Sequence, residues 1–349
     1  MSGRIMKRFA AVAMGVVLAA CGAAPRQSFT ELVYATPYAP GHPFSRADIE
    51  WMQFVEQASG GRLRIRPSWS GALLSSEHSM LELRHGVADI GLITPIYVKA
   101  GVHLIRVQSG FYSGAETMEK QLAMYRCLAA AHPEFDAEMK GLHVLAVQGG
   151  SLPGVLTRDR PVRTLADFRG LRIRAPTELL SVLRHLGADP VNMPMGEVYS
   201  ALAKGVIDGV IASGDTFKSL HFAEVAHHFS FLAVPRGAYP ARAMSQDRWS
   251  RLTDEERRVL AESTRVWEDA LARQTFAAQE SGFATGRAAG VEFIRMDPAD
   301  QTAFDRLYLA DAESNAAGLE RYGIDGSAVF RTARASLRAD GVIACPGEG

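Results

Sequence analysis

The sequence predicts an α/β protein built from two similar lobes and a long helix near its C-terminal end. Two groups of alternating strand and helix patterns, one near the N-terminus and one after residue 140, each indicate a lobe with a parallel sheet. A helical pattern then continues from Thr253 toward Arg287, which is long enough to brace both lobes. The chain has 349 residues, 47% of them hydrophobic and 22% charged, so two domains with cores of their own are possible.

The first group of patterns predicts a β-α-β-α-β lobe. Strands are expected at residues 32–36, 62–66 and 89–94. Ser45 and Asp48 form the pattern of a capping box, which predicts a helix that reaches about Ala58. Ser75 or Ser76 caps a second helix, which ends near residue 86 at a glycine.

The same order returns after residue 140. Strands are expected at residues 142–148, 171–174 and 208–212, extended chain at 190–193, a short turn at 164–170, and helices at 178–186 and 197–204. The segments Leu83–Asp89 and Leu202–Asp208 each combine a helix end, a glycine, two small apolar residues and an aspartate that opens a strand. This match suggests two similar lobes, although similar βα units also arise by convergence.

The last third of the chain is predicted to be mainly helical. Thr253 caps the long helix, and acidic residues follow it where the helix dipole favours negative charge. A strand at 291–296 and helices from Pro298 onward complete the chain. We therefore predict lobe I at residues 28–151 and 240–279, and lobe II at residues 152–239 and 280–349.

The N-terminus predicts export from the cytoplasm. Three basic residues precede the apolar run Phe9–Ala20, which is shorter than the roughly 20 residues of a membrane span but typical of a secretory signal. The run ends in the lipobox-like sequence Leu18–Cys21, which predicts a signal peptide at residues 1–21 and lipidation of Cys21. A conventional cleavage near Ala23 or Ala24, which would remove Cys21, is the alternative. Both interpretations place the mature protein in the periplasm.

Charge and cysteine content restrict the partners. Lys and Arg together number 38, as do Asp and Glu, so the net charge of zero gives no indication of a nucleic-acid or anionic-membrane partner. The remaining cysteines, Cys127 and Cys345, would lie in an oxidising compartment, where they either form a disulfide or stay as buried thiols. Their spacing does not decide between these alternatives. We expect a small ligand held by local charge.

We find no pattern typical of an enzyme, a cofactor site or a metal site. The chain has no zinc-protease, Walker A or dinucleotide-binding motif, and Pro153 occupies the final glycine position of a nucleophile elbow. His221, His227 and His228 could be metal ligands, but adjacent residues point to different faces, so surface histidines are the favoured interpretation.

Arg174 is the strongest candidate for ligand binding. It lies at the carboxyl end of the strand predicted at 171–174, where open α/β sheets bind ligands, and its planar guanidinium matches a carboxylate with two parallel hydrogen bonds. Arginines at strand ends are usually solvated, so position alone does not establish this role. Arg172 shares the strand face but lies further from that end.

The segment Asp167–Pro176 resembles the D-x-K-G-L-K-I-R-V-P motif of DctP-type receptors of tripartite ATP-independent periplasmic (TRAP) transporters. The resemblance continues, in order and spacing, through residues 186–194, 197–202 and 205–209. It implies a two-lobed periplasmic-binding-protein fold, similar to type II, which closes on its ligand by hinge bending. It also implies a monomeric receptor that delivers an organic acid to a small and a large membrane subunit.

The resemblance also implies site residues. Arg174 matches the family arginine that pairs with the ligand carboxylate, and Tyr199 matches an aromatic that either contacts the ligand or packs between the lobes. Many members continue with D-G-Q-E-N-P after the buried strand, where this chain lacks the asparagine, so Ser213 or Asp215 is expected to replace its contact. The second arginine of sialic-acid receptors is absent from residues 152–156, which makes sialic acid an unlikely ligand.

Two other functions remain open at this stage. The chain could serve an ABC importer, which adjacent ATPase genes would indicate, or it could be the ligand-binding module of a sensory system. The sequence does not identify the acid, because dicarboxylates, keto acids, aromatic acids and sugar acids all fit one arginine.

Overall fold

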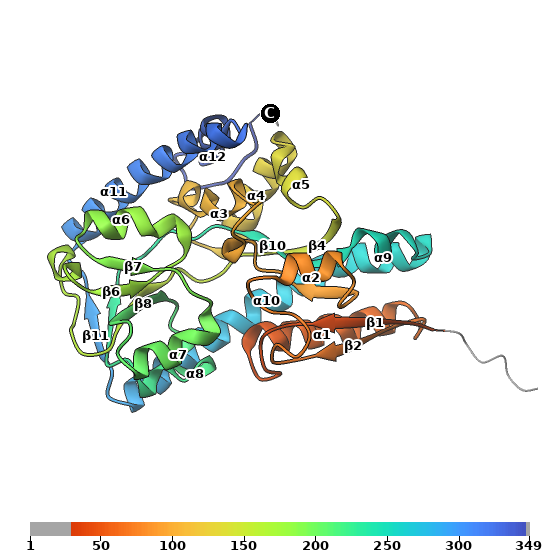
Figure 1. The fold of residues 1–349 in the computed structure, drawn as a ribbon, viewed down its shortest axis with the longest axis horizontal. Coiled ribbons are helices and arrows are strands. Elements are labelled where there is room, and N and C mark those ends of the chain that lie inside the picture. Colours follow the sequence, from red (N-terminus) through yellow and green to blue (C-terminus); the bar gives the residue numbers. More distant parts are fainter. Residues whose placement is uncertain (1–28, 347–349) are drawn as a thin grey trace, which may run out of the picture.

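The computed structural model describes residues 29–346. Figure 1 shows two α/β lobes side by side, with the long helix α10 (Asp254–Ala288) running between them. The two sheets contain five and six strands, which confirms the predicted α/β class and the two-lobed architecture. None of the helices in the described part of the chain is both long and apolar enough to cross a membrane.

Lobe I contains a five-stranded sheet in the order β2-β1-β3-β10-β4. Its strands are β1 (Thr30–Ala35), β2 (Leu63–Ser68), β3 (Ile90–Leu92), β4 (Leu142–Gln148) and β10 (Tyr239–Ser245). Strands β1, β2 and β3 are parallel as predicted, whereas β10 runs antiparallel between β3 and β4. Its helices are α1 (Pro43–Ala58), α2 (Ser79–Arg84), α3 (Leu104–Val107), α4 (Met118–Ala131), α5 (Glu134–Glu138) and α9 (Gln246–Ser250), with 3-10 turns η1 (Pro95–Tyr97) and η2 (Gln108–Tyr112).

Lobe II contains a six-stranded sheet in the order β11-β9-β5-β8-β6-β7. Its strands are β5 (Gly154–Thr157), β6 (Arg172–Arg174), β7 (Asp189–Val191), β8 (Gly209–Ala212), β9 (His228–Phe231) and β11 (Glu292–Arg295). Its helices are α6 (Leu180–His185), α7 (Met195–Ala203) and α8 (Thr216–Ser219), with 3-10 turns η3 (Leu165–Phe168), η4 (Thr177–Leu179) and η5 (Phe222–Glu224). Strands β6, β7 and β8 are parallel as predicted, whereas β5 runs antiparallel between β8 and β9.

The two matching sequence segments have the same local structure. Asp89 accepts a hydrogen bond from the backbone of Val33 at 2.7 Å, and Asp208 accepts one from the backbone of Arg172 at 2.8 Å. In each lobe the aspartate therefore ties the start of a buried strand to the strand beside it. This shared geometry explains why the same residue type opens both strands.

Helix α10 braces both lobes. Thr253 and Glu256 form the capping box at its start, as the acidic first turn predicts. The helix packs on α1 and β4 of lobe I and on α8 of lobe II. A Cβ atom at Gly282 would lie 2.1 Å from the Gly214 carbonyl oxygen, so only glycine allows α10 to approach the loop after β8 this closely.

Two predicted helix starts are wrong. Helix α1 begins at Pro43 with His42 as its N-cap, and Asp48 is occupied by an ion pair with Arg242 instead of a capping box. Helix α2 begins at Ser79, not at a cap formed by Ser75 or Ser76. For α1, the residue that matched half of a capping box is instead bound to Arg242, 194 residues away in the chain.

The C-terminal segment returns to lobe I. Helix α11 (Pro298–Ala317), the turn η6 (Gly318–Tyr322) and helix α12 (Gly326–Ser336) lead to Cys345, which forms a disulfide with Cys127 of α4. The disulfide decides the question that spacing left open. The predicted boundaries assign residues 280–349 to lobe II, whereas α12 packs on α4 and η2 of lobe I, and the other boundaries stay a prediction. The signal peptide and Cys21 lie outside the described residues.

Candidate functional site

A cavity with a volume of about 150 Å³ lies between the lobes. The segments after β1, β3, β6 and β8 line it, so it lies at the carboxyl ends of parallel strands from both sheets. Its polar and aromatic lining includes Tyr38, His42, Thr94, Tyr97, Ser109, Arg174, Glu178, Ser213, Asp215, Arg236 and Tyr239.

Arg174 is one of the residues that line this cavity. It is 4% exposed, and it donates from Nε to the carbonyl of Met193 at 2.9 Å and from Nη2 to the hydroxyl of Tyr97 at 2.6 Å. Among the described residues, no carboxylate oxygen lies within 4.0 Å of its guanidinium. Arg174 is therefore a buried cation whose two hydrogen-bond acceptors in the protein are both neutral.

Arg172 has a different environment. Its guanidinium binds Asp208 through two hydrogen bonds of 2.6 Å and 3.0 Å, and its side chain is 42% exposed. Strand β6 ends before Pro176, which lacks a backbone N–H, so Arg174 occupies the strand end. The two arginines of one short strand thus have separate roles, because Arg172 has an acidic partner from the protein and Arg174 does not.

Ser213 and Asp215 also line the cavity, after β8. Ser213 donates to Asp215, which accepts a second bond from Ser219 at 3.0 Å. Burial raises the pKa of the Asp215 carboxyl, and the hydrogen bonds from the two serines oppose this increase. Both oxygens of Asp215 consequently have donors before any ligand arrives.

Tyr199 lies elsewhere. It is part of α7, and its hydroxyl donates to Glu224 at 2.7 Å. The residues that line the cavity do not include it. Of the four predicted site residues, the structure therefore brings Arg174, Ser213 and Asp215 together and leaves Tyr199 outside, so a ligand contact of Tyr199 stays a prediction.

The structure adds a second arginine that the sequence analysis missed. Arg236 follows β9, and a backbone hydrogen bond of 3.1 Å from Val234 to Pro153 holds its loop beside lobe II. A Cβ atom at Gly150 would lie 2.6 Å from the guanidinium carbon of Arg236, so the glycine makes room for this side chain. In the sequence, only the Gly-Gly pair before Ser151 could have indicated that another group lies close to the backbone there. The pair does not indicate which distant side chain that group belongs to.

Glu178 is the second residue that the sequence analysis missed. It lies in η4, lines the cavity and is 6% exposed, and its Oε2 has no hydrogen-bond partner. Burial raises its pKa to about 7, although Ser109, Arg174 and Arg236 act in the opposite direction. In the sequence it was only the expected first residue of a helix.

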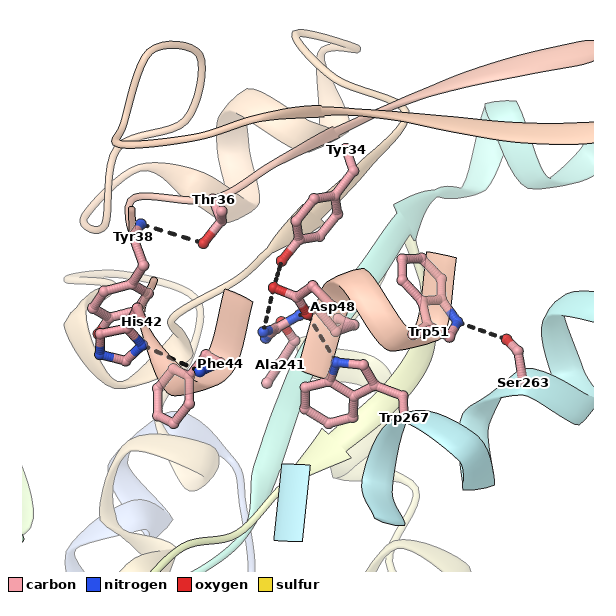
Figure 2. Close-up of polar contacts among 11 residues, drawn as sticks. Tyr34, Thr36, Tyr38, His42, Phe44, Asp48, Trp51, Ala241, Ser263 and Trp267 are labelled. Carbon is pink, nitrogen blue, oxygen red and sulfur yellow. Dashed lines mark hydrogen bonds and ion pairs between the residues drawn. The ribbon is translucent and has the colours of Figure 1, made fainter. Parts of the chain in front are cut away.

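Aromatic side chains form the wall on the lobe I side. Tyr38 stacks on His42 with ring centroids 4.0 Å apart, and Phe44 packs edge-on against both, as Figure 2 shows. Burial, together with the charges of Arg46 and Arg242, lowers the pKa of His42 to about 3. His42 is therefore neutral at physiological pH, and this wall suits the apolar part of a ligand.

Comparisons with known proteins find matches over most of this chain. The family model described as bacterial extracellular solute-binding protein, family 7 (DctP) matches residues 34–312. A solute-binding protein of Chromohalobacter salexigens is 27% identical over 284 residues, which cover 76% of this chain and 79% of that protein.

Solved structures show the same fold. A TRAP periplasmic solute-binding protein of Desulfovibrio salexigens is 26% identical with a TM-score of 0.68, over 88% of this chain and 95% of that one. A TRAP solute-binding protein of Rhodoferax ferrireducens, in complex with copurified benzoate, is 24% identical with a TM-score of 0.79, over 88% and 97% of the two chains.

Proposed function

We infer the function from the family, since the chain belongs to family 7 of the bacterial extracellular solute-binding proteins, the DctP family of periplasmic TRAP receptors. We propose that its interlobe cavity captures a small carboxylic acid for uptake. Family 7 proteins are receptors. The receptor would then deliver the acid as a monomer to a small and a large membrane subunit.

One observation carries the proposal, namely that Arg174 is buried without an acidic partner. A buried charge is costly unless it is paired, and the protein supplies only a carbonyl and a hydroxyl. A ligand carboxylate would accept charge-assisted bonds from the guanidinium and form the direct ion pair that no acid of the protein forms with Arg174. Arg236, in the same cavity, adds a second cationic group.

The cavity has room for an acid of modest size, and it adjoins a second pocket of about 520 Å³ that shares Tyr38, His42 and Asp215. Apolar cavities of about 150 Å³ accommodate benzene, and this cavity has a volume of about 150 Å³. The Rhodoferax receptor contains benzoate. We therefore propose an acid about as large as benzoate, with its carboxylate at Arg174 and its apolar part against Tyr38 and His42.

Substitution of Arg174 tests this proposal. A panel of organic acids is first screened by thermal shift, because ligand at a hundred times its Kd adds about 2.7 kcal/mol of stability. For the best acid, Arg174→Ala should then weaken binding by about 2 to 5 kcal/mol, which is roughly 30-fold to several-thousand-fold in Kd. Arg174→Lys should restore only part of the affinity, because lysine lacks the planar pair of donors.

Arg172→Ala is the matched control for calorimetric titration. It removes an arginine two positions away on the same strand, but one that is paired with Asp208 and does not line the cavity. Its effect on ligand binding should be below about 1 kcal/mol. Wild-type affinity in folded Arg174→Ala would reject the central contact of the proposal.

We further propose that the receptor is anchored to a membrane through lipidated Cys21, since Leu18–Cys21 resembles a lipobox. Acyl labelling of the wild type and of Cys21→Ser tests this anchor. A mature N-terminus downstream of Cys21 would contradict it.

A further inference from the structure

The cavity contains a charge arrangement that a carboxylate ligand would unbalance. Arg174 and Arg236 contribute two positive charges, and Glu178 and Asp215 are the two acids beside them. If both acids are ionised, the site is neutral before the ligand enters. Each ligand carboxylate would then add one uncompensated negative charge among buried side chains, which is unfavourable at low dielectric.

Glu178 is the acid that can remove this excess. Its Oε2 is buried without a donor, whereas both oxygens of Asp215 accept hydrogen bonds from serine hydroxyls. An ionised carboxylate with an oxygen that no donor reaches is costly, and protonation removes that cost. Glu178 is also buried, at 6% exposure, so solvent does not compensate its charge.

Asp311 of α11 is a second buried acid whose Oδ2 has no hydrogen-bond partner, but unlike Glu178 it does not line the cavity that the ligand would enter. Arg174 of β6 and Arg236 of the loop after β9 act on Glu178 from the cavity, and Ser109 of η2 donates a hydrogen bond to it. The turn η4 also packs against α3, α6 and α11. The titratable and charged groups of these elements include Arg106, which donates to the Lys99 carbonyl, and Arg184. His185 pairs with Asp311 at 3.3 Å. Burial and the charge of Glu178 raise the pKa of Tyr308, which is therefore neutral.

We propose that this site selects acids with a single negative charge, and that Glu178 binds one proton together with the ligand. The proton comes from solvent, and in the complex the two arginines are balanced by the ligand carboxylate and Asp215. A dicarboxylate would require a second proton or leave a buried negative charge. This inference rests on the proposed function and deepens it by specifying the charge class of the acid.

The pH dependence of binding follows from the direction of this linkage. The raised pKa of Glu178, about 7 in the free receptor, means that the proton is already bound well below pH 7. The ligand carboxylate raises that pKa further, because it adds a like charge and engages Arg174. Affinity should therefore be constant below about pH 6 and should fall by up to about tenfold per pH unit above pH 7.

Calorimetric titration at pH 6 and pH 8, each in two buffers of different ionisation enthalpy, measures the proton directly. The probes are benzoate and phthalate, phenylacetate and phenylmalonate, and glucuronate and glucarate, so that each monocarboxylate has a dicarboxylate counterpart. For the tightest probe, the wild type should take up close to one proton per ligand at pH 8 and much less at pH 6. In each pair the monocarboxylate should bind more tightly.

Three variants assign the proton. Glu178→Gln, which imitates the protonated carboxyl, should abolish proton uptake and make affinity independent of pH at the wild-type pH 6 value. Glu197→Gln removes an exposed carboxylate of α7 outside the cavity and should leave uptake unchanged. Asp215→Asn, which removes the other negative charge, should reduce uptake, because the two arginines then balance both the ligand carboxylate and an ionised Glu178.

The possible failures are distinguishable. If none of the six acids binds, the proposed function itself fails. If an acid binds through Arg174, the proposed function stands. This inference is then overturned if the wild type takes up no proton at pH 8, if uptake persists in Glu178→Gln, or if the dicarboxylates bind more tightly.

Discussion

Two arginines are buried among residues 29–346, and their surroundings differ in the source of the counter-charge. Arg242, in β10 of lobe I, is 1% exposed and pairs with Asp48, which is fully buried. Arg174, in β6 of lobe II, is 4% exposed and has no carboxylate within 4.0 Å among the described residues. Burial is therefore the same, and only the source of the counter-charge differs.

The Arg242 site is complete within the protein. Asp48 accepts bonds from Nε and Nη2 of Arg242 at 2.7 Å and 3.1 Å, from the Tyr34 hydroxyl at 2.6 Å and from the Trp267 indole at 2.8 Å. Figure 2 shows Tyr34 and Trp267 converging on Asp48. The ring of Trp267 also lies 4.5 Å from the guanidinium carbon of Arg242. A fully satisfied cluster of this kind joins α1, β10 and α10, whereas the Arg174 site stays incomplete until a ligand enters.

The largest effect should come from breaking the complete site. Asp48→Ala leaves a buried guanidinium without its counter-charge and leaves two aromatic donors without an acceptor. We expect a loss of about 3 to 5 kcal/mol in the free energy of unfolding, measured by urea denaturation. Asp247→Ala, which removes an exposed ion pair with Arg251, is the control and should change stability little. If Asp48→Ala were as stable as the wild type, Asp48 would not be a required counter-charge for Arg242, and the description of the Arg242 site as complete would be wrong.

A smaller effect is expected at the acid beside Arg174. The pKa of Glu178 is about 7 in the folded protein, above its ordinary value of 4.5, so the folded state binds this proton more tightly than the unfolded chain does. Stability is therefore lost as pH rises from about 4.5 to 7. Glu178→Gln removes this loss, and its stability relative to the wild type should be greater at pH 8 than at pH 4 by up to about 3 kcal/mol.

Urea denaturation of both proteins at the two pH values measures this difference. Glu197→Gln, which removes a solvated carboxylate, serves as the control and should show no such dependence. An equal effect of Glu178→Gln at pH 4 and pH 8 would show that Glu178 ionises freely in the fold.

The contrast between the two arginines also shows what the sequence could predict. Arg174 could be placed at a strand end from the sequence because a short motif and a strand end are local features. Arg242 was not, because β10 contains Pro240 and register irregularities beside Arg242, which do not form an alternating strand pattern. Asp48 looked like half of a capping box, but its partner lies 194 residues away in the chain. No local pattern contains that information.

The same reason explains the incomplete prediction of the site. Ser213 and Asp215 follow a recognisable buried strand, so their place at the cavity was predictable. Glu178 and Arg236 come from a turn and a loop on either side of that strand in the sequence, and only the packing of lobe II brings both to the cavity. Parallel pairing was predictable because each strand and its helix are consecutive, whereas the antiparallel return of β10 depends on the whole intervening lobe.

The smallest effect should be the stability change caused by Arg174→Ala in the absence of ligand. Removing Arg174 loses its bonds to Met193 and Tyr97, but it also removes a buried cation that has no acidic partner. These contributions oppose each other, so we expect a change below about 1 kcal/mol in the free energy of unfolding. Arg242→Ala is the matched comparison and should be destabilising, because it leaves Asp48 as an unpaired buried charge.

Adding ligand should distinguish the two variants by the stability that each one gains. With the best acid at saturating concentration, the wild type and any folded Arg242→Ala should gain stability, whereas Arg174→Ala should gain almost none, because the stabilisation depends on affinity. Urea denaturation with and without the acid measures both halves. A large stability loss in ligand-free Arg174→Ala would show that Arg174, like Arg242, already has its counter-charge within the protein, and the distinction between a complete and an incomplete arginine site would not hold.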